Sequence, residues 1–275
     1  MKYILSTVIT ISVLLLTAGC STAPKTILKE HGTLDLQYSP QQQNTRVNKT
    51  ISIVSPFFLD IGVVKKNKKT LSEYELPTFP GVDTRDSVNQ YKKQLVNAFN
   101  ITMFEILSKK GFLTKGPFDT FDDITYSEKK QIYLTIIPKF ELILNKRVEQ
   151  SQCNTEICRE SGILQLGGSL QLKVIEPLTQ QAILNKRINL SDLQIEEKYI
   201  YDIVNFNSKT YTPIYKAGWE LQTPDVAKNN YDVAVTNVMN KFYKQAFEKI
   251  QRYISREELL DQESDVKKLK EIKRY

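Results

Sequence analysis

Two stretches in the middle of the chain, "IYLTIIPKFELIL" (Ile132–Leu144) and "ILQLGGSLQLKVIEP" (Ile163–Pro177), decide the fold class. Both alternate apolar and polar side chains with a period of two, and the apolar side chains fall on even-numbered positions in both. Such alternation indicates antiparallel strands with one face on a core and the other in water. We predict a β-hairpin, with bends or bulges at Pro138 and at the pair Gly167 and Gly168.

The polar stretch between these strands, "NKRVEQSQCNTEIC" (Asn145–Cys158), is predicted to be the solvated end of the hairpin, because the apolar alternation stops near Leu144. The chain has three cysteines and one histidine. In an exported protein Cys153 and Cys158 form an even pair, for which a local disulfide is expected, and a zinc site there would lack ligands. The two basic residues near the start of this stretch, Lys146 and Arg147, are either a solvated charged pair or a binding site for an acidic ligand.

Two long helices are predicted from apolar residues that recur at three- and four-residue steps, at about Thr84–Lys110 and Tyr231–Ile254. Gly111 is a stop signal for the first helix, and Ser255 starts a short charged helix after the second. Shorter elements are also expected: strands at 34–38, 51–58 and about 182–193, a turn at 177–181, and an exposed excursion at 62–83.

The order of these elements predicts an α+β fold with a single domain. We expect a mixed, mainly antiparallel sheet with two long helices packed on one face, because the last helix needs the sheet to bury its apolar stripe. The domain is predicted to span residues 33–255, and residues 256–275 are predicted to be a basic charged C-terminal tail.

The N-terminus has the features of a bacterial lipoprotein signal peptide. A single Lys2 precedes a short apolar run, and "LTAGC" (Leu16–Cys20) matches the lipobox, whose cysteine is acylated and begins the mature chain. We predict a signal peptide at 1–19 and a lipidated tether at 20–32. Acyl chains on Cys20 are expected to hold the protein at a membrane, and Ser21 is compatible with sorting to the outer membrane.

The charge of the chain favours acidic partners. The formal net charge of +7 becomes +6 when Lys2 is removed with the signal peptide. For an exported basic protein, lipid headgroups and acidic sugars are plausible partners, whereas nucleic acid is not expected.

Catalytic and cofactor motifs are missing from the sequence. The one histidine, His31, lies in the predicted tether, and no glycine-rich phosphate loop is present. We therefore expect neither an enzyme nor a cofactor. The aromatic residues Tyr211, Tyr215 and Trp219 form a possible sugar-stacking platform, for which burial in the core is the main alternative.

Several segments resemble the neuraminyllactose-binding hemagglutinin family, a family of adhesin lipoproteins also associated with flagellar sheaths. The resemblance rests on "GTLDLQYSP", "ISIVSPFF" and "LKVIEPLTQQAILNKRINLSDLQIEEKYI", followed by the helix "VTNVMNKFYKQAFEKIQRYISREELL", in the same order over most of the mature chain. It implies an outer-membrane lipoprotein, on the cell surface or on a flagellar sheath, that binds sialylated glycans on host cells. The alternative is a non-lectin structural or assembly lipoprotein of the outer membrane or flagellar sheath.

The resemblance also implies a receptor site. The family's Lys-Arg-Thr-Ile-Gln-Lys-Lys motif matches this sequence at Lys146, Arg147 and Gln150. Its two closing lysines are replaced by Ser151 and Gln152, and an acid is gained at position 149. Two cations and one acid thus stand where the motif has four cations. An arginine with nearby hydroxyl or amide donors is a sensible minimum for the single carboxylate of sialic acid.

Overall fold

The structure, a computed structural model, describes residues 27–40, 44–66, 84–153, 157–204 and 227–272. Cys20 and the aromatic residues Tyr211, Tyr215 and Trp219 lie outside these ranges. The elements in chain order are β1 (Ile27–Lys29), β2 (Thr50–Val54), β3 (Phe57–Lys66), α2 (Thr84–Lys109), β4 (Leu113–Phe118), η1 (Phe121–Asp123), α3 (Tyr126–Gln131), β5 (Leu134–Cys153), β6 (Ile157–Ile175), β7 (Ala182–Asn189), η2 (Leu190–Leu193), β8 (Glu196–Val204), β9 (Ala227–Asn229), α4 (Tyr231–Tyr253), α5 (Arg256–Asp261) and α6 (Glu263–Ile272).

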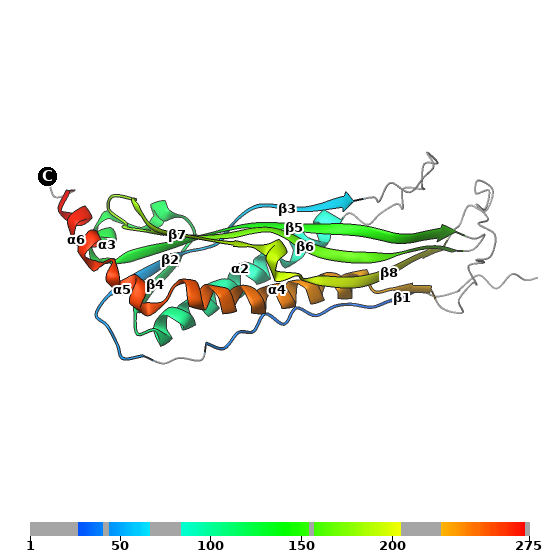
Figure 1. Cartoon of the computed structure of the whole chain (residues 1–275), viewed down its shortest axis with the longest axis horizontal. Helices are drawn as coiled ribbons and strands as arrows, with labels where there is room; N and C mark the ends of the chain where they lie inside the picture. The colour runs from blue at the N-terminus through cyan, green and yellow to red at the C-terminus, as the bar shows by residue number, and fades with distance from the viewer. Residues whose placement is uncertain (1–26, 41–43, 67–83, 154–156, 205–226, 273–275) are drawn as a thin grey trace, which may run out of the picture.

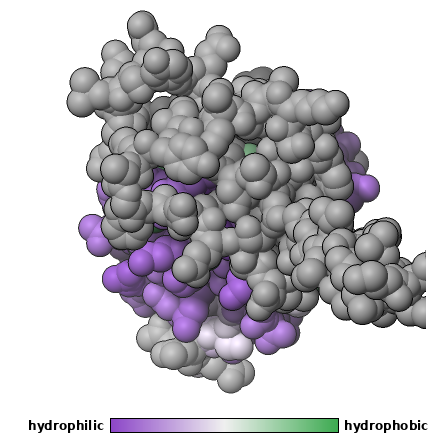
Figure 2. Space-filling view, turned by 90° about the vertical axis from the view of Figure 1, so that its right-hand side faces the viewer, coloured by the Kyte–Doolittle hydropathy of each residue, from purple (hydrophilic) through white to green (hydrophobic). Residues whose placement is uncertain are grey.

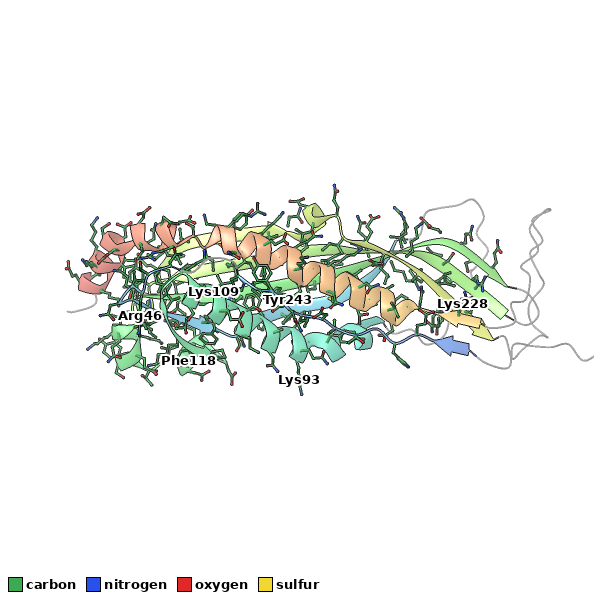
Figure 3. All side chains as sticks on the ribbon, turned by 90° about the horizontal axis from the view of Figure 1, so that it is seen from below. Arg46, Lys93, Lys109, Phe118, Lys228 and Tyr243 are labelled. Atoms are coloured by element: carbon green, nitrogen blue, oxygen red, sulfur yellow. The ribbon has the colours of Figure 1, made fainter. Side chains whose placement is uncertain are left out.

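One long sheet and two helices make up the two layers of the fold. Within the described residues, the strands form a single sheet of order β1-β9-β8-β6-β5-β2-β4, with β3 added beside β5 and β7 beside β6. Helices α2 and α4 run along one face of this sheet (Figures 1 and 3). The central pairs β5–β6, β6–β7 and β6–β8 are antiparallel, whereas β2 and β3 pair with β5 in parallel. The predicted α+β class is confirmed.

The two long helices agree with the predicted ranges to within one residue, and they build the core. Their apolar stripes meet the even-numbered side chains of β5 and β6. Phe99 of α2 lies at the centre, with its ring centroid 5.1 Å from those of Phe140 on β5 and Phe247 on α4. Gly111 ends α2 with a φ of 90°, a left-handed conformation that favours glycine.

The hairpin of β5 and β6 is longer than predicted. The two strands stay paired, with one register shift, from Thr135 opposite Ile175 to Cys153 opposite Cys158. The prediction that the strand ends near Leu144 is therefore wrong. The polar residues after that position pair with β6, which pairs with β8 in turn. The neighbouring strands therefore supply the backbone hydrogen bonds in a segment where the side chains do not alternate between apolar and polar.

No bulge lies at the positions where bends or bulges were predicted. Register between β5 and β6 is continuous at Pro138 and at Gly167 and Gly168, and the one shift between these strands lies between Val148 and Gln150. Pro138, which lacks an N–H, falls where β5 changes its parallel partner from β2 to β3. Gly168 has a φ of 98°, and a Cβ built there would lie 2.0 Å from a backbone oxygen on β5.

The segment 34–38 is extended but is not a strand, so that prediction is wrong. Its polar partners are side chains of α4 rather than another strand. The Asp35 N–H donates to Asn240 Oδ1 at 2.8 Å, and Asn240 Nδ2 donates to the Thr33 carbonyl at 3.0 Å. The segment 51–58 divides into β2 and β3, and β3 extends to Lys66.

The C-terminal residues fold back onto the domain. Ser255 Oγ accepts the Glu258 N–H at 3.1 Å, as the predicted cap requires, and Leu259 and Val266 are buried. Lys270 Nζ donates to the Ile132 carbonyl at 2.6 Å. Helices α5 and α6 lie at one end of the molecule, and β1 with the closed end of the β5–β6 hairpin lies at the other (Figure 1).

Candidate functional site

The two basic residues that the sequence singled out lie on opposite faces of the sheet. Successive side chains of a strand alternate between faces. Lys146 continues the buried series of Leu142 and Leu144 beneath α4, whereas Arg147 lies on the opposite face, which we call the outer face. The pair is therefore not a single cationic site.

Lys146 is the centre of a buried polar cluster. Its ammonium forms an ion pair with Glu160 on β6, and the two side chains are only 6% and 7% exposed. The same ammonium lies 5.3 Å and 5.6 Å from the ring centroids of Tyr199 on β8 and Tyr231 on α4. The Tyr199 hydroxyl donates to Glu160 at 3.0 Å. The expectation that Lys146 is solvated is wrong, and its contacts are those of a residue that joins β5, β6, β8 and α4.

The tyrosines of this cluster remain neutral. Burial, and next the negative charge of Glu160, raise the pKa of Tyr199 and of Tyr231 well above the ordinary tyrosine range. The cluster therefore holds one buried cation and one buried anion, with aromatic rings beside them. Such an arrangement favours a fixed strand geometry beneath the outer face.

Arg147 and Gln150 share the outer face because of the bulge. The register shift between Val148 and Gln150 inserts one residue into β5, so that Gln150 lies opposite Ser161, which also belongs to the outer face. Without this extra residue, the even-numbered Gln150 would lie on the side of Lys146. Gln150 is exposed, and the Arg147 side chain is 45% exposed. The structure thus brings together two of the three predicted contact residues.

Neighbouring strands add further polar and basic groups to this face. In register across the sheet, Lys66 of β3 lies opposite Arg147, Arg147 opposite Ile163 of β6, and Ile163 opposite Lys198 of β8. We call Arg147 and Lys198 the basic row. Ser161 and Lys198 were not predicted, because strand register cannot be read from a single sequence.

A second arginine on the outer face is already paired. Arg159 of β6 forms a bidentate salt bridge with Asp202 of β8, in which Nε and Nη2 lie 2.7 Å and 2.8 Å from the two carboxylate oxygens. By contrast, Arg147 has one long contact, from Nη2 to Glu149 at 3.4 Å, with both side chains about half exposed. Arg147 is therefore the more available of the two guanidinium groups for an external carboxylate.

The cysteines at the closed end of the hairpin are register partners. Cys153 lies directly opposite Cys158, and Cys158 is buried. Opposed positions on adjacent strands bring the two Cβ atoms within the range that a disulfide requires. The pairing is therefore compatible with the predicted disulfide, which stays a prediction.

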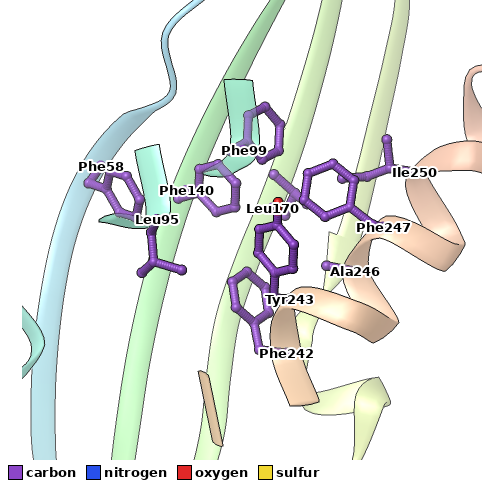
Figure 4. A pocket seen from close by; sticks show the side chains of 10 residues that line it. All are labelled: Phe58, Leu95, Phe99, Phe140, Leu170, Phe242, Tyr243, Ala246, Phe247 and Ile250. Carbon is purple, nitrogen blue, oxygen red and sulfur yellow. The ribbon is translucent and has the colours of Figure 1, made fainter. Parts of the chain in front are cut away.

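Other hollows of the described structure fit a glycan less well. The apolar cavity between the helices and the sheet has a volume of about 10 Å³, no more than one water needs (Figure 4). A shallow polar hollow of about 550 Å³ is lined partly by Arg46 and Lys109, far from the hairpin end (Figure 3). Lys109 Nζ there already donates to the Pro40 carbonyl at 2.5 Å.

Most of the described residues visible at the hairpin end are hydrophilic (Figure 2). Among the described residues, no group of three or more His, Cys, Asp or Glu side chains is arranged to hold a metal ion. None of the helices in those parts of the chain is long and apolar enough to cross a membrane.

Comparisons with known proteins agree with the resemblance noted in the sequence. The family model described as "Neuraminyllactose-binding hemagglutinin precursor" matches residues 10–273. Neuraminyllactose-binding hemagglutinins from Helicobacter pylori strains ATCC 700392 / 26695 and J99 / ATCC 700824 are each 23% identical over 270 residues, covering 94% of this chain and 91% of theirs. A crystal structure described as that of a homolog from the same species has a similar fold, with a TM-score of 0.54 and 16% identity over 84% of this chain and 99% of that chain. The chain therefore belongs to the neuraminyllactose-binding hemagglutinin family.

Proposed function

We propose that this protein is a lipid-anchored surface protein of the outer membrane that binds sialylated host glycans and so mediates adhesion. The binding site is the outer face of the β5–β6 hairpin around Arg147 and Gln150. The protein acts by binding rather than by catalysis, and it needs no cofactor.

The placement of Arg147, Gln150 and Ser161 on one exposed face is the observation that carries this proposal. A sialic acid presents a carboxylate beside hydroxyl and amide groups. The Arg147 guanidinium offers two parallel N–H donors to that carboxylate, while the Gln150 amide and the Ser161 hydroxyl donate to and accept from the sugar. The name of the Helicobacter pylori relatives refers to neuraminyllactose, which supports this ligand class.

The buried cluster supports the site without touching the ligand. Lys146 and Glu160 fix the pairing of β5 with β6 directly beneath Arg147, so that the guanidinium is presented from a rigid strand. In this proposal Lys146 is a positioning residue, and the match of Lys146 to the family motif reflects the sheet rather than ligand contact.

The membrane attachment is proposed from the sequence. Acyl chains on Cys20 hold the protein at the outer membrane, and the six residues between Cys20 and β1 span at most about 25 Å. We further propose that Cys153 and Cys158 form a disulfide that closes the hairpin.

Binding of 3′-sialyllactose and of lactose to the mature chain, with Cys20 replaced by serine, tests the proposal by isothermal titration calorimetry. We expect sialic-acid-dependent binding that falls about 10- to 100-fold in Arg147→Ala, because charge-assisted hydrogen bonds contribute about 1.5–3 kcal/mol. Arg46→Ala removes another exposed arginine, far from the site, and is the control. Absence of any sialic-acid dependence refutes the proposal and favours the non-lectin envelope role.

A further inference from the structure

The basic row spans more of the sheet than one carboxylate needs. Adjacent strands lie about 4.8 Å apart, so the backbones at Arg147 and Lys198, separated by β6, are about 10 Å apart. Lys198 is exposed, and among the described residues it takes part in no ion pair. The outer face therefore offers a second cationic group at a fixed distance from the first.

The charges of this row are only partly compensated. Glu149 offsets Arg147 through a single long contact, with both side chains in solvent. An anion bound between Arg147 and Lys198 would therefore meet two cationic groups whose charge the described protein contacts leave largely uncompensated.

The surface between Arg147 and Lys198 is apolar. Ile163 lies between them in register, and Ile200 of β8 lies opposite Ser161 in the next row. Both isoleucines are partly exposed. A small apolar floor between two cations suits the apolar face of a sugar ring that carries acidic groups towards both sides.

We propose that the preferred ligand carries two acidic groups, the first bound by Arg147 and Gln150 and the second by Lys198. This inference rests on the proposed function, because it uses the same site for the first acidic group. Disialylated glycans and sialylated glycans with a neighbouring sulfate share this chemistry.

The row also explains how the site can work with a reduced motif. The strand itself lost two cations relative to the family motif, where Ser151 and Gln152 now stand. Lys198 comes from β8, more than 40 positions further along the chain, and reaches the same face through the sheet register. Basic charge is therefore distributed across strands rather than along one strand.

A comparison of singly and doubly acidic glycans tests this inference. The mature chain with Cys20→Ser is titrated with 3′-sialyllactose, with disialyllactose and with a sulfated 3′-sialyllactose. We expect at least one doubly acidic ligand to bind about fivefold more tightly than 3′-sialyllactose, the upper end of what an exposed ion pair contributes. The ligand that shows the gain distinguishes a second carboxylate from a sulfate.

Two matched variants assign the gain to its residue. Lys198→Gln should abolish the preference for the doubly acidic ligand and leave binding of 3′-sialyllactose unchanged. Lys173→Gln is the control, because Lys173 is exposed on the same face of β6 but ten residues from Ile163. Equal affinity for singly and doubly acidic ligands, or an equal loss for both in Lys198→Gln, overturns the inference while the proposed function stands. Absence of binding to every sialylated ligand overturns both.

Discussion

Replacing Lys146 by alanine should destabilise the fold far more than replacing its neighbour Arg147. The Lys146 ammonium is buried against Glu160, and both side chains are less than a tenth exposed. Removing the cation leaves a buried carboxylate without its partner, which typically costs about 3–5 kcal/mol. Arg147 lies half exposed on the other face, where substitutions usually change stability by less than about 0.5 kcal/mol.

A double variant separates the charge from the packing. Lys146→Met with Glu160→Gln removes both charges, keeps the side-chain volumes similar, and leaves the Tyr199 hydroxyl an amide oxygen as its partner. Removing both members of a buried ion pair is often close to neutral. We therefore expect the double variant to recover more than half of the stability that Lys146→Ala loses.

Urea unfolding followed by circular dichroism measures these differences as shifts of the midpoint at unchanged slope. The variants are compared in the same mature chain with Cys20→Ser. Equal losses for Lys146→Ala and Arg147→Ala, or a double variant no more stable than Lys146→Ala, would refute the reasoning that Lys146 is a buried structural cation.

Three further predictions concern stability. Hydrogen bonds, the strongest from Lys115 and the next from Thr125, hold the pKa of Glu128 at about 2, below its usual 4.5. The ionised Glu128 therefore stabilises the fold fully above about pH 4.5, and this contribution is lost as the pH falls through 2. Urea midpoints of wild type and Glu128→Gln should therefore differ at pH 6 and converge near pH 2; a constant difference would contradict this. A disulfide between Cys153 and Cys158 should protect both cysteines from alkylation until a reductant is added, and alkylation without reductant would exclude it. The double variant Cys153→Ser, Cys158→Ser should lower the free energy of unfolding by about 2 kcal/mol, because the closed loop is short. Gly168→Ala should cost more than about 1 kcal/mol because its φ is 98° and the added Cβ would meet a backbone oxygen; an unchanged melting temperature would contradict this.

The sequence predicted those parts of the fold in which the pattern of apolar side chains indicates which face is buried. The stripes of α2 and α4 and the even-numbered alternation of β5 and β6 each show a buried face, and both helix ranges are confirmed to within one residue. The pattern failed where polar residues are held by neighbouring strands. After Leu144 the alternation disappears from the side chains, yet pairing with β3 and β6 continues.

The candidate site could be predicted only in part. The family motif pointed to Lys146, Arg147 and Gln150. Strand alternation separates Lys146 from Arg147, but Gln150 joins the face of Arg147 only through a bulge that no local sequence signal marks. The extended segment 34–38 is a similar case, because its alternation is real but its hydrogen-bond partner is a helix 200 positions away. In both cases the missing information is tertiary pairing.

An NMR titration of the arginine Nε–Hε resonances with 3′-sialyllactose, and with lactose as control, tests the central claim most directly. The account predicts that the Arg147 resonance shifts and saturates with sialyllactose alone, while those of Arg46 and of the Asp202-bound Arg159 stay in place. An unmoved Arg147 resonance, or saturating shifts at Arg46 instead, would contradict a sialic acid site on the outer face of the hairpin.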